Sequence, residues 1–111
     1  MCRSVENRET RWSMLEKTIE RKFAAALRAR GAMAWKFTSP GRQGVPDRIV
    51  LMPGGKVAFV ELKTETGRLS PVQKVVQEQM RALGFDVYTV YGAQQAMELA
   101  LTLMGGEADA V

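Results

Sequence analysis

Hydrophobic side chains recur at every fourth position in the first part of the chain, starting at Leu15. This period places them on one face of a helix, and Gly31 is a natural stop for that helix. Residues 1–12 carry alternating charges and show no such period, so we expect a flexible arm before the helix. The predicted apolar face consists of Leu15, Ile19, Phe23 and Leu27.

Three short segments typical of β-strands follow the helix. The first is aromatic and covers 32–38, the second is the apolar run 49–52, and the third is 56–63. Glycines and prolines mark 39–46 as a loop and 53–55 as a tight turn. Because the second connection is so short, we expect the strands to form an antiparallel meander.

A helix, a strand and a final helix complete the pattern. Ser70 is a suitable N-cap with Pro71 at the first helical position, and the helix should extend to about Leu83. A strand at 85–91 and a helix at about 93–104 come next. A crossover connection makes the strands on either side of the second helix parallel. The expected apolar face of that second helix consists of Val72, Val75, Val76, Met80 and Leu83.

The predicted elements define an α/β fold in the order αβββαβ, a mixed sheet flanked by helices. A length of 111 residues suits one domain, which we place at 13–104, with a flexible tail at 105–111. No apolar run approaches the roughly 20 residues needed to cross a bilayer, so we expect no membrane association. The first residues do not resemble a secretory signal and Cys2 is the only cysteine, which favours the reducing cytoplasm.

The charge of the chain narrows the possible chemistry. A net charge of +4 favours an anionic partner such as nucleic acid, although ordinary solubility accounts for it equally well. The chain contains no histidine. This excludes Ser-His-Asp and Cys-His triads and most zinc sites, so catalysis must use carboxylates, lysine, hydroxyls or a hard metal ion.

Three residues provide such chemistry. Glu61 and Lys63 alternate along one strand and therefore project to the same face; alone, they could form a structural ion pair. Asp47 begins the preceding strand, and the tight turn brings it to the same end as Glu61. Two adjacent carboxylates repel each other unless a cation lies between them, and oxygen ligands suit Mg²⁺ or Mn²⁺. With Lys63 near a phosphate or a water molecule, the set suits metal-assisted phosphodiester hydrolysis.

The same residues carry a family resemblance. Asp47, preceded by Pro46 and followed by Glu61-x-Lys63, resembles the signature of the PD-(D/E)xK nucleases. Gly44-Val-Pro-Asp47 and Gly67-Arg-Leu-Ser-Pro-x-Gln73 resemble the VRR-NUC branch, most closely its stand-alone phage and bacterial members. The likeness extends over about 15–91. It implies a restriction-endonuclease-like core.

The resemblance assigns roles to individual residues. Asp47 and Glu61 would be metal ligands together with the backbone carbonyl of Leu62, and Lys63 would orient or activate the attacking water. Two further catalytic positions are implied. They are an acidic residue in the first helix, Glu20 with Glu16 as the alternative, and the polar residue Gln73.

DNA contacts are expected around this site. A glycine-bounded loop lets the backbone approach phosphates, and nearby basic residues would form a rim; an ordinary solvated loop is the equal alternative. Trp35 and Phe37 are expected in the core rather than as platforms for base stacking. The predicted DNA-binding residues are Lys36, Arg42, Gln43, Arg48 and Arg68.

The favoured function is a Mg²⁺- or Mn²⁺-dependent DNA endonuclease in the cytoplasm of a bacterial or phage-infected cell. The resemblance implies a preference for branched or nicked DNA, as in a Holliday-junction resolvase, and a homodimer. The alternatives are a DNA-binding module with a nuclease fold but no activity, and a purely structural or interaction domain.

Overall fold

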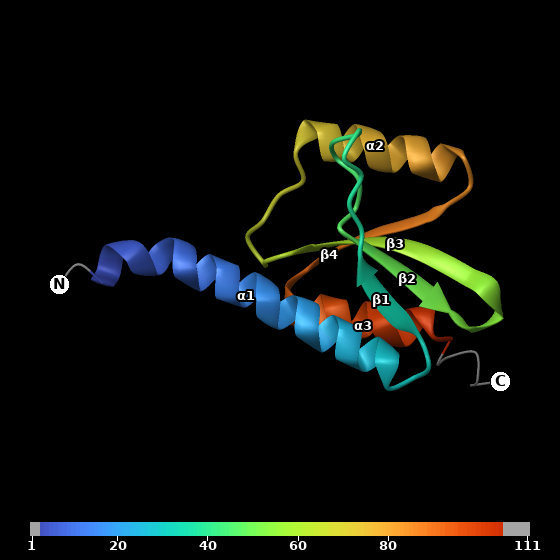
Figure 1. Cartoon of the computed structure of the whole chain (residues 1–111), viewed down its shortest axis with the longest axis horizontal. Coiled ribbons are helices and arrows are strands. Elements are labelled where there is room, and N and C mark those ends of the chain that lie inside the picture. The colour runs from blue at the N-terminus through green and yellow to red at the C-terminus, as the bar shows by residue number, and fades with distance from the viewer. Residues whose placement is uncertain (1–2, 106–111) are drawn as a thin grey trace.

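In the computed structural model, residues 3–105 are described, with side chains from Leu15 onward, and they form a mixed four-stranded sheet between helices (Figure 1). The predicted order of elements is confirmed. The elements are α1 (Arg3–Arg28), β1 (Met33–Lys36), β2 (Arg48–Met52), the 3₁₀ turn η1 (Pro53–Gly55), β3 (Lys56–Lys63), α2 (Pro71–Ala82), β4 (Asp86–Tyr91) and α3 (Gly92–Leu103).

The sheet has the strand order β1-β2-β3-β4. The pairs β1–β2 and β2–β3 are antiparallel, which confirms the predicted meander. Strands β3 and β4 are parallel, as the crossover through α2 predicts. Glu61 is thereby aligned with Thr89 of β4.

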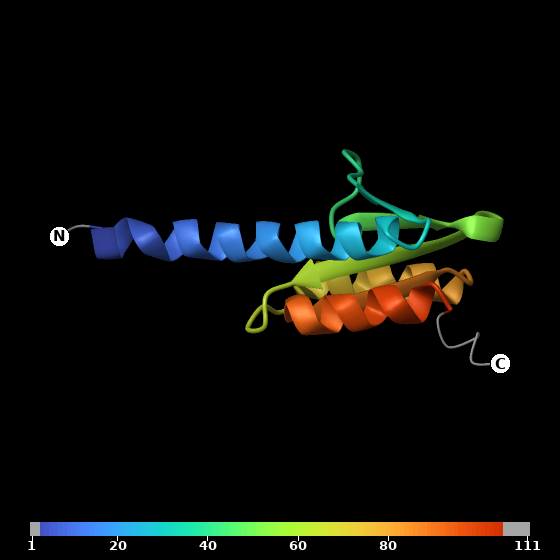
Figure 2. The same cartoon turned by 90° about the horizontal axis from the view of Figure 1, so that it is seen from below.

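The core lies on the sheet face that α1 and α3 cover (Figure 2). Phe23 and Leu27 of α1 are fully buried there, as are Val50 of β2 and Val60 of β3. Helix α2 packs against the other face, over β4 (Figure 1). The domain is therefore a three-layer structure in which one sheet face is covered much more fully than the other.

Helix α1 is longer than the sequence predicts. It begins at Arg3, so 3–12 is helical rather than an arm without regular structure. Glutamate and arginine are good helix formers, and extending an existing helix costs far less than starting one. The N-terminal half of α1 projects beyond the sheet (Figure 1). Leu15 is consequently exposed, whereas Ile19, Phe23 and Leu27 are buried as predicted.

The start of α2 is confirmed, but its predicted apolar face is largely wrong. The Ser70 hydroxyl accepts a hydrogen bond from the Gln73 amide, and the Gln73 side chain bonds back to the Ser70 amide. Val76 is buried, but it shares the buried side with the polar Gln77. Val72, Val75 and Leu83 are instead exposed.

The expectation that Trp35 belongs to the core is also wrong. Trp35 is 54% exposed, because β1 is an edge strand and α2 packs over β4 at the other side of the sheet. Phe37 is half-buried, and its ring lies 5.5 Å from that of Phe59. Phe85, which is exposed, meets Phe59 edge-on at 5.9 Å.

The loop at 39–46 is held against α2. Gly44 has a φ of +89°, and a Cβ atom there would lie 2.7 Å from Cγ1 of Val72. Only glycine combines this backbone conformation with so close an approach. The loop then passes through the buried Pro46 into Asp47, so this packing contributes to fixing where β2 begins.

None of the helices within 3–105 is both long enough and apolar enough to span a bilayer. The predicted tail lies, apart from Gly105, outside the described residues.

Candidate active site

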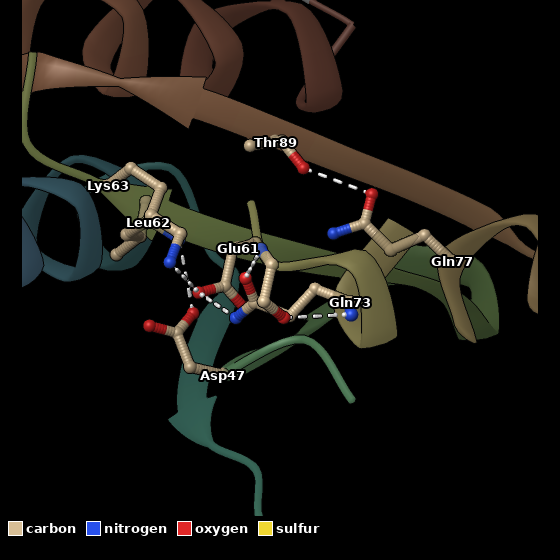
Figure 3. Close-up of polar contacts among 8 residues, drawn as sticks. Asp47, Glu61, Leu62, Lys63, Gln73, Gln77 and Thr89 are labelled. Carbon is tan, nitrogen blue, oxygen red and sulfur yellow. Dashed lines mark hydrogen bonds and ion pairs between the residues drawn. The ribbon is translucent and has the colours of Figure 1, made fainter. Parts of the chain in front are cut away.

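Asp47 and Glu61 meet at one end of the β2–β3 pair. Arg48 is aligned with Val60, so continuing the antiparallel register by one residue places Asp47 opposite Glu61. Asp47 Oδ1 accepts a hydrogen bond of 3.2 Å from the Leu62 amide (Figure 3). This contact is made by the Leu62 nitrogen, and the role of its carbonyl as a metal ligand stays a prediction.

Glu61 is 5% exposed, and its contacts with the side chains of Gln73 and Lys63 use the same carboxylate oxygen. Oε2 accepts a hydrogen bond of 3.2 Å from Gln73 Nε2 and lies 3.5 Å from Lys63 Nζ (Figure 3). Oε1 is buried and has no hydrogen-bond partner among the described residues. The structure thus brings Asp47, Glu61, Lys63 and Gln73 together, as the sequence predicts.

Burial and mutual repulsion make negative charge costly at this site. The pKa of Asp47 is raised from 3.8 to about 7, mainly because the carboxyl is desolvated and also because the charge of Glu61 is near. Burial likewise raises the pKa of Glu61 above its ordinary 4.5, while Lys63 opposes the rise. A bound cation would relieve both effects.

Glu20 lies close enough to influence Asp47. Its charge contributes to the raised pKa of Asp47, whereas Glu16 is exposed and has no comparable contact within the described part of the chain. The geometry therefore favours Glu20 over Glu16 as the acidic residue of the first helix. Its carboxylate is engaged with Arg48, at 3.0 Å between Oε1 and Nη2.

The predicted DNA-binding residues differ in their surroundings. Lys36, Gln43 and Arg68 are exposed. Arg42 is also exposed, and its guanidinium donates to Gln79 Oε1 of α2 at 2.5 Å. The Arg48 side chain is only 11% exposed and faces Glu20. Arg48 therefore serves as the counter-ion of Glu20, and its role in binding DNA stays a prediction.

The donor set at this site fits a hard divalent cation. Two carboxylates lie together, and Glu61 Oε1 is an acceptor without a partner among the described residues. Among the side chains that the structure describes, from Leu15 to Gly105, no cluster of three or more His, Cys, Asp or Glu is found. Mg²⁺ is commonly held by one or two carboxylates, with water and substrate phosphate completing its shell. Asp47 and Glu61 match that arrangement.

One polar group near the site was not predicted from the sequence. Gln77, on the buried side of α2, accepts hydrogen bonds from Thr89 at 3.0 Å and from Arg81 at 3.2 Å. The available signal was the four-residue spacing between Gln73 and Gln77, which places both on one side of the helix. Val72, Val75 and Val76 also follow a helical period, and they predicted an apolar buried side instead.

The raised pKa of Asp47 predicts how stability depends on pH when metal is removed with EDTA. Between about pH 4 and 7, the unfolded chain has Asp47 ionised while the folded chain keeps it protonated. The free energy of unfolding, measured with urea, should therefore fall as the pH rises through this range. The expected fall is on the order of a few kcal/mol, since a tenfold change in proton affinity corresponds to about 1.4 kcal/mol.

Asp47→Asn should remove most of this fall, while Glu78→Gln, which alters an exposed carboxyl on α2, should leave it in place. If the free energy of unfolding of Asp47→Asn fell with pH as steeply as that of the wild type, the raised pKa would not belong to Asp47.

Comparisons with known proteins identify the family of this chain. A family model described as the VRR-NUC domain matches residues 2–94. "Putative nuclease p44" of Acyrthosiphon pisum secondary endosymbiont phage 1 is 43% identical over 72 residues, 65% of this chain and 77% of that protein. A solved structure described as "VRR_NUC domain" matches with a TM-score of 0.71 and 30% identity, covering 76% of this chain and 91% of the other. The chain therefore belongs to the VRR-NUC family of nucleases, which have a restriction-endonuclease-like fold.

Proposed function

We propose that this nuclease is a DNA endonuclease that hydrolyses phosphodiester bonds with Mg²⁺ or Mn²⁺. The observation that carries the proposal is the pairing of the buried Glu61 carboxylate with the half-buried Asp47 carboxylate at the end of β2 and β3. Their environment raises both pKa values. A site that disfavours its own negative charge is suited to a cation, which would polarise the phosphate and lower the pKa of a bound water.

The neighbouring side chains would act around that cation. Asp47 and Glu61 would hold it. Lys63, whose ammonium lies 3.5 Å from Glu61 Oε2, would donate to a phosphate oxygen or orient the attacking water. Gln73 donates to the same oxygen of Glu61 and so fixes the direction of the carboxylate.

A basic groove beside the site offers a path for the DNA backbone. It has a volume of about 410 Å³ and lies along α1 next to the start of β2. Arg21 and Arg28 line it, both are exposed, and neither pairs with a carboxylate among the described side chains. Glu20 and Arg48 also line the groove, which connects it to the catalytic residues. We propose that phosphates lie against these two free arginines.

A preference for branched or nicked DNA and a homodimeric state complete the proposal. Each chain provides one site, whereas cutting both strands of a junction requires two, and a two-fold dimer would supply them. The open sheet face supports self-association. Met33, Trp35, Val57 and Phe85 are all exposed there, and an uncharged surface of this kind can pair with a second copy of itself.

The alternative is a DNA-binding module without activity. A panel of labelled junction, flap, nicked and linear duplex DNAs, incubated with Mg²⁺, Mn²⁺ or EDTA, separates the two. We expect metal-dependent cleavage that is strongest on the branched or nicked members. Salt-sensitive binding without cleavage of any substrate would establish the alternative instead.

Lys63→Ala should keep metal and DNA affinity and lose cleavage by about 10²–10⁴-fold, the usual scale for a residue that assists proton transfer. The control is Lys56→Ala, which removes an exposed lysine at the other end of β3 and should cleave normally. Single-turnover rates at saturating metal are the measurement. Unchanged cleavage by Lys63→Ala would refute its catalytic role.

Arg21→Ala and Arg28→Ala should each reduce the salt dependence of DNA binding. One lost phosphate contact lowers the slope of log K against log salt concentration by about 0.9. Fluorescence anisotropy in EDTA at several salt concentrations measures it. Lys22→Ala, an exposed change on the same helix but outside the groove, should keep the wild-type slope. Identical slopes in all three variants would place the DNA elsewhere.

The oligomeric state of the protein tests whether the open sheet face around Trp35 is a dimer interface. Light scattering coupled to size-exclusion chromatography should give twice the chain mass for the wild type and the single-chain mass for Trp35→Asp. Leu101→Asp alters an exposed apolar residue of α3, on the opposite side of the sheet, and should remain dimeric. A wild type that is monomeric at every concentration would refute the dimer.

A further inference from the structure

Two glutamines on α2 lie over two neighbouring strand residues. Gln73 Nε2 donates to Glu61 Oε2 at 3.2 Å, and one turn later Gln77 Oε1 accepts from Thr89 Oγ1 at 3.0 Å (Figure 3). Glu61 and Thr89 are aligned across the parallel β3–β4 pair, so their side chains project to the same face. Gln77 therefore sits beside the catalytic carboxylate, although no direct bond joins them.

The orientation of the Gln77 amide is fixed by its partners. Its oxygen also accepts from Arg81 Nη2 at 3.2 Å, and a guanidinium is only a donor, so the oxygen must face Arg81. Arg81 is itself held by the Val87 carbonyl, at 3.2 Å from Nε and 2.9 Å from Nη2. The Gln77 nitrogen must consequently point away from Arg81. Figure 3 shows it directed toward the side on which Glu61 lies.

The site thus contains a donor and an acceptor that complement each other. Gln77 is 1% exposed, and its Nε2 has no hydrogen-bond partner among the described residues. Glu61 Oε1 is equally buried and is an acceptor without a partner in the same part of the chain. Buried polar groups left without partners are costly and are commonly joined by an ordered water. Here the two lie on one side of the sheet, above adjacent strands.

We propose that Gln77 is a positioning residue for Glu61, acting through one ordered water that Nε2 binds and that donates to Oε1. The carboxylate would then be held on both sides, by the hydrogen bond from Gln73 at Oε2 and by Gln77 at Oε1. Groups that orient a metal ligand typically change metal affinity by 10–100-fold when they are removed. The inference rests on the proposed role of Glu61 as a metal ligand.

Gln77→Met and Thr89→Val distinguish this role from a merely structural one. Gln77→Met keeps the size of the side chain and removes its donor together with the oxygen that accepts from Thr89 and Arg81. Thr89→Val breaks the bond between α2 and β4 at Gln77 Oε1 but leaves the Gln77 nitrogen in place. Calorimetric titration with Mn²⁺ should show 10–100-fold weaker binding by Gln77→Met and near wild-type binding by Thr89→Val. DNA affinity in EDTA should be unchanged in both.

Thermal melting accompanies each titration. The positioning role is refuted if Gln77→Met binds Mn²⁺ as tightly as the wild type. It is also refuted if both variants lose Mn²⁺ affinity in proportion to their loss of melting temperature. In either case the nuclease proposal stands. If the wild type itself binds no Mn²⁺, the metal-dependent function fails instead.

A measurement on the metal-free wild type tests the bridge independently of metal binding and of how the variants fold. Nuclear magnetic resonance should show a cross-relaxation peak between the Gln77 side-chain amide protons and a long-lived water. The exposed side-chain amide of Gln43 is the internal control and should show no such peak. A Gln77 amide without a bound water would overturn the bridge.

Discussion

Two carboxylates that repel each other are held side by side by the hydrogen bonds of a sheet. The β2–β3 register brings Asp47 opposite Glu61, and the Leu62 amide binds the Asp47 side chain directly. Burial desolvates the Asp47 carboxyl and the charge of Glu61 lies near, so the pKa of Asp47 rises to about 7. The backbone thus imposes a geometry that the side chains alone would avoid, which is typical of functional sites.

The elements around Asp47 and Glu61 supply groups that offset the negative charge of the site. Lys63 and Gln73 approach Glu61 from β3 and α2, while Arg48 neutralises Glu20 between α1 and β2. Gly44 lets the loop before Asp47 pack against α2. The position of α2 is therefore tied to the site from two directions, by the hydrogen bond of Gln73 to Glu61 and by the close approach of Gly44 to Val72.

The two faces of the sheet serve different purposes. Helices α1 and α3 cover one face with a closed hydrophobic core, which stabilises the domain. The other face carries the active site next to α2 and an open apolar surface around Trp35. The Asp47–Glu61 pair and the hydrophobic core thus lie on opposite faces of the sheet, because successive side chains of each strand point to opposite faces, while Glu20 and Arg48 meet on the α1 side.

The sequence by itself determined the order of elements, the strand directions, and the association of Asp47, Glu61 and Lys63. Local rules suffice for these, because a short turn and the two-residue period of a strand decide which side chains meet. The tertiary structure decided that Arg48 pairs with Glu20, that Gln77 is buried and that Trp35 and Val75 are exposed. Periodicity identifies residues that share a face, but only the packing of distant elements decides which face is covered.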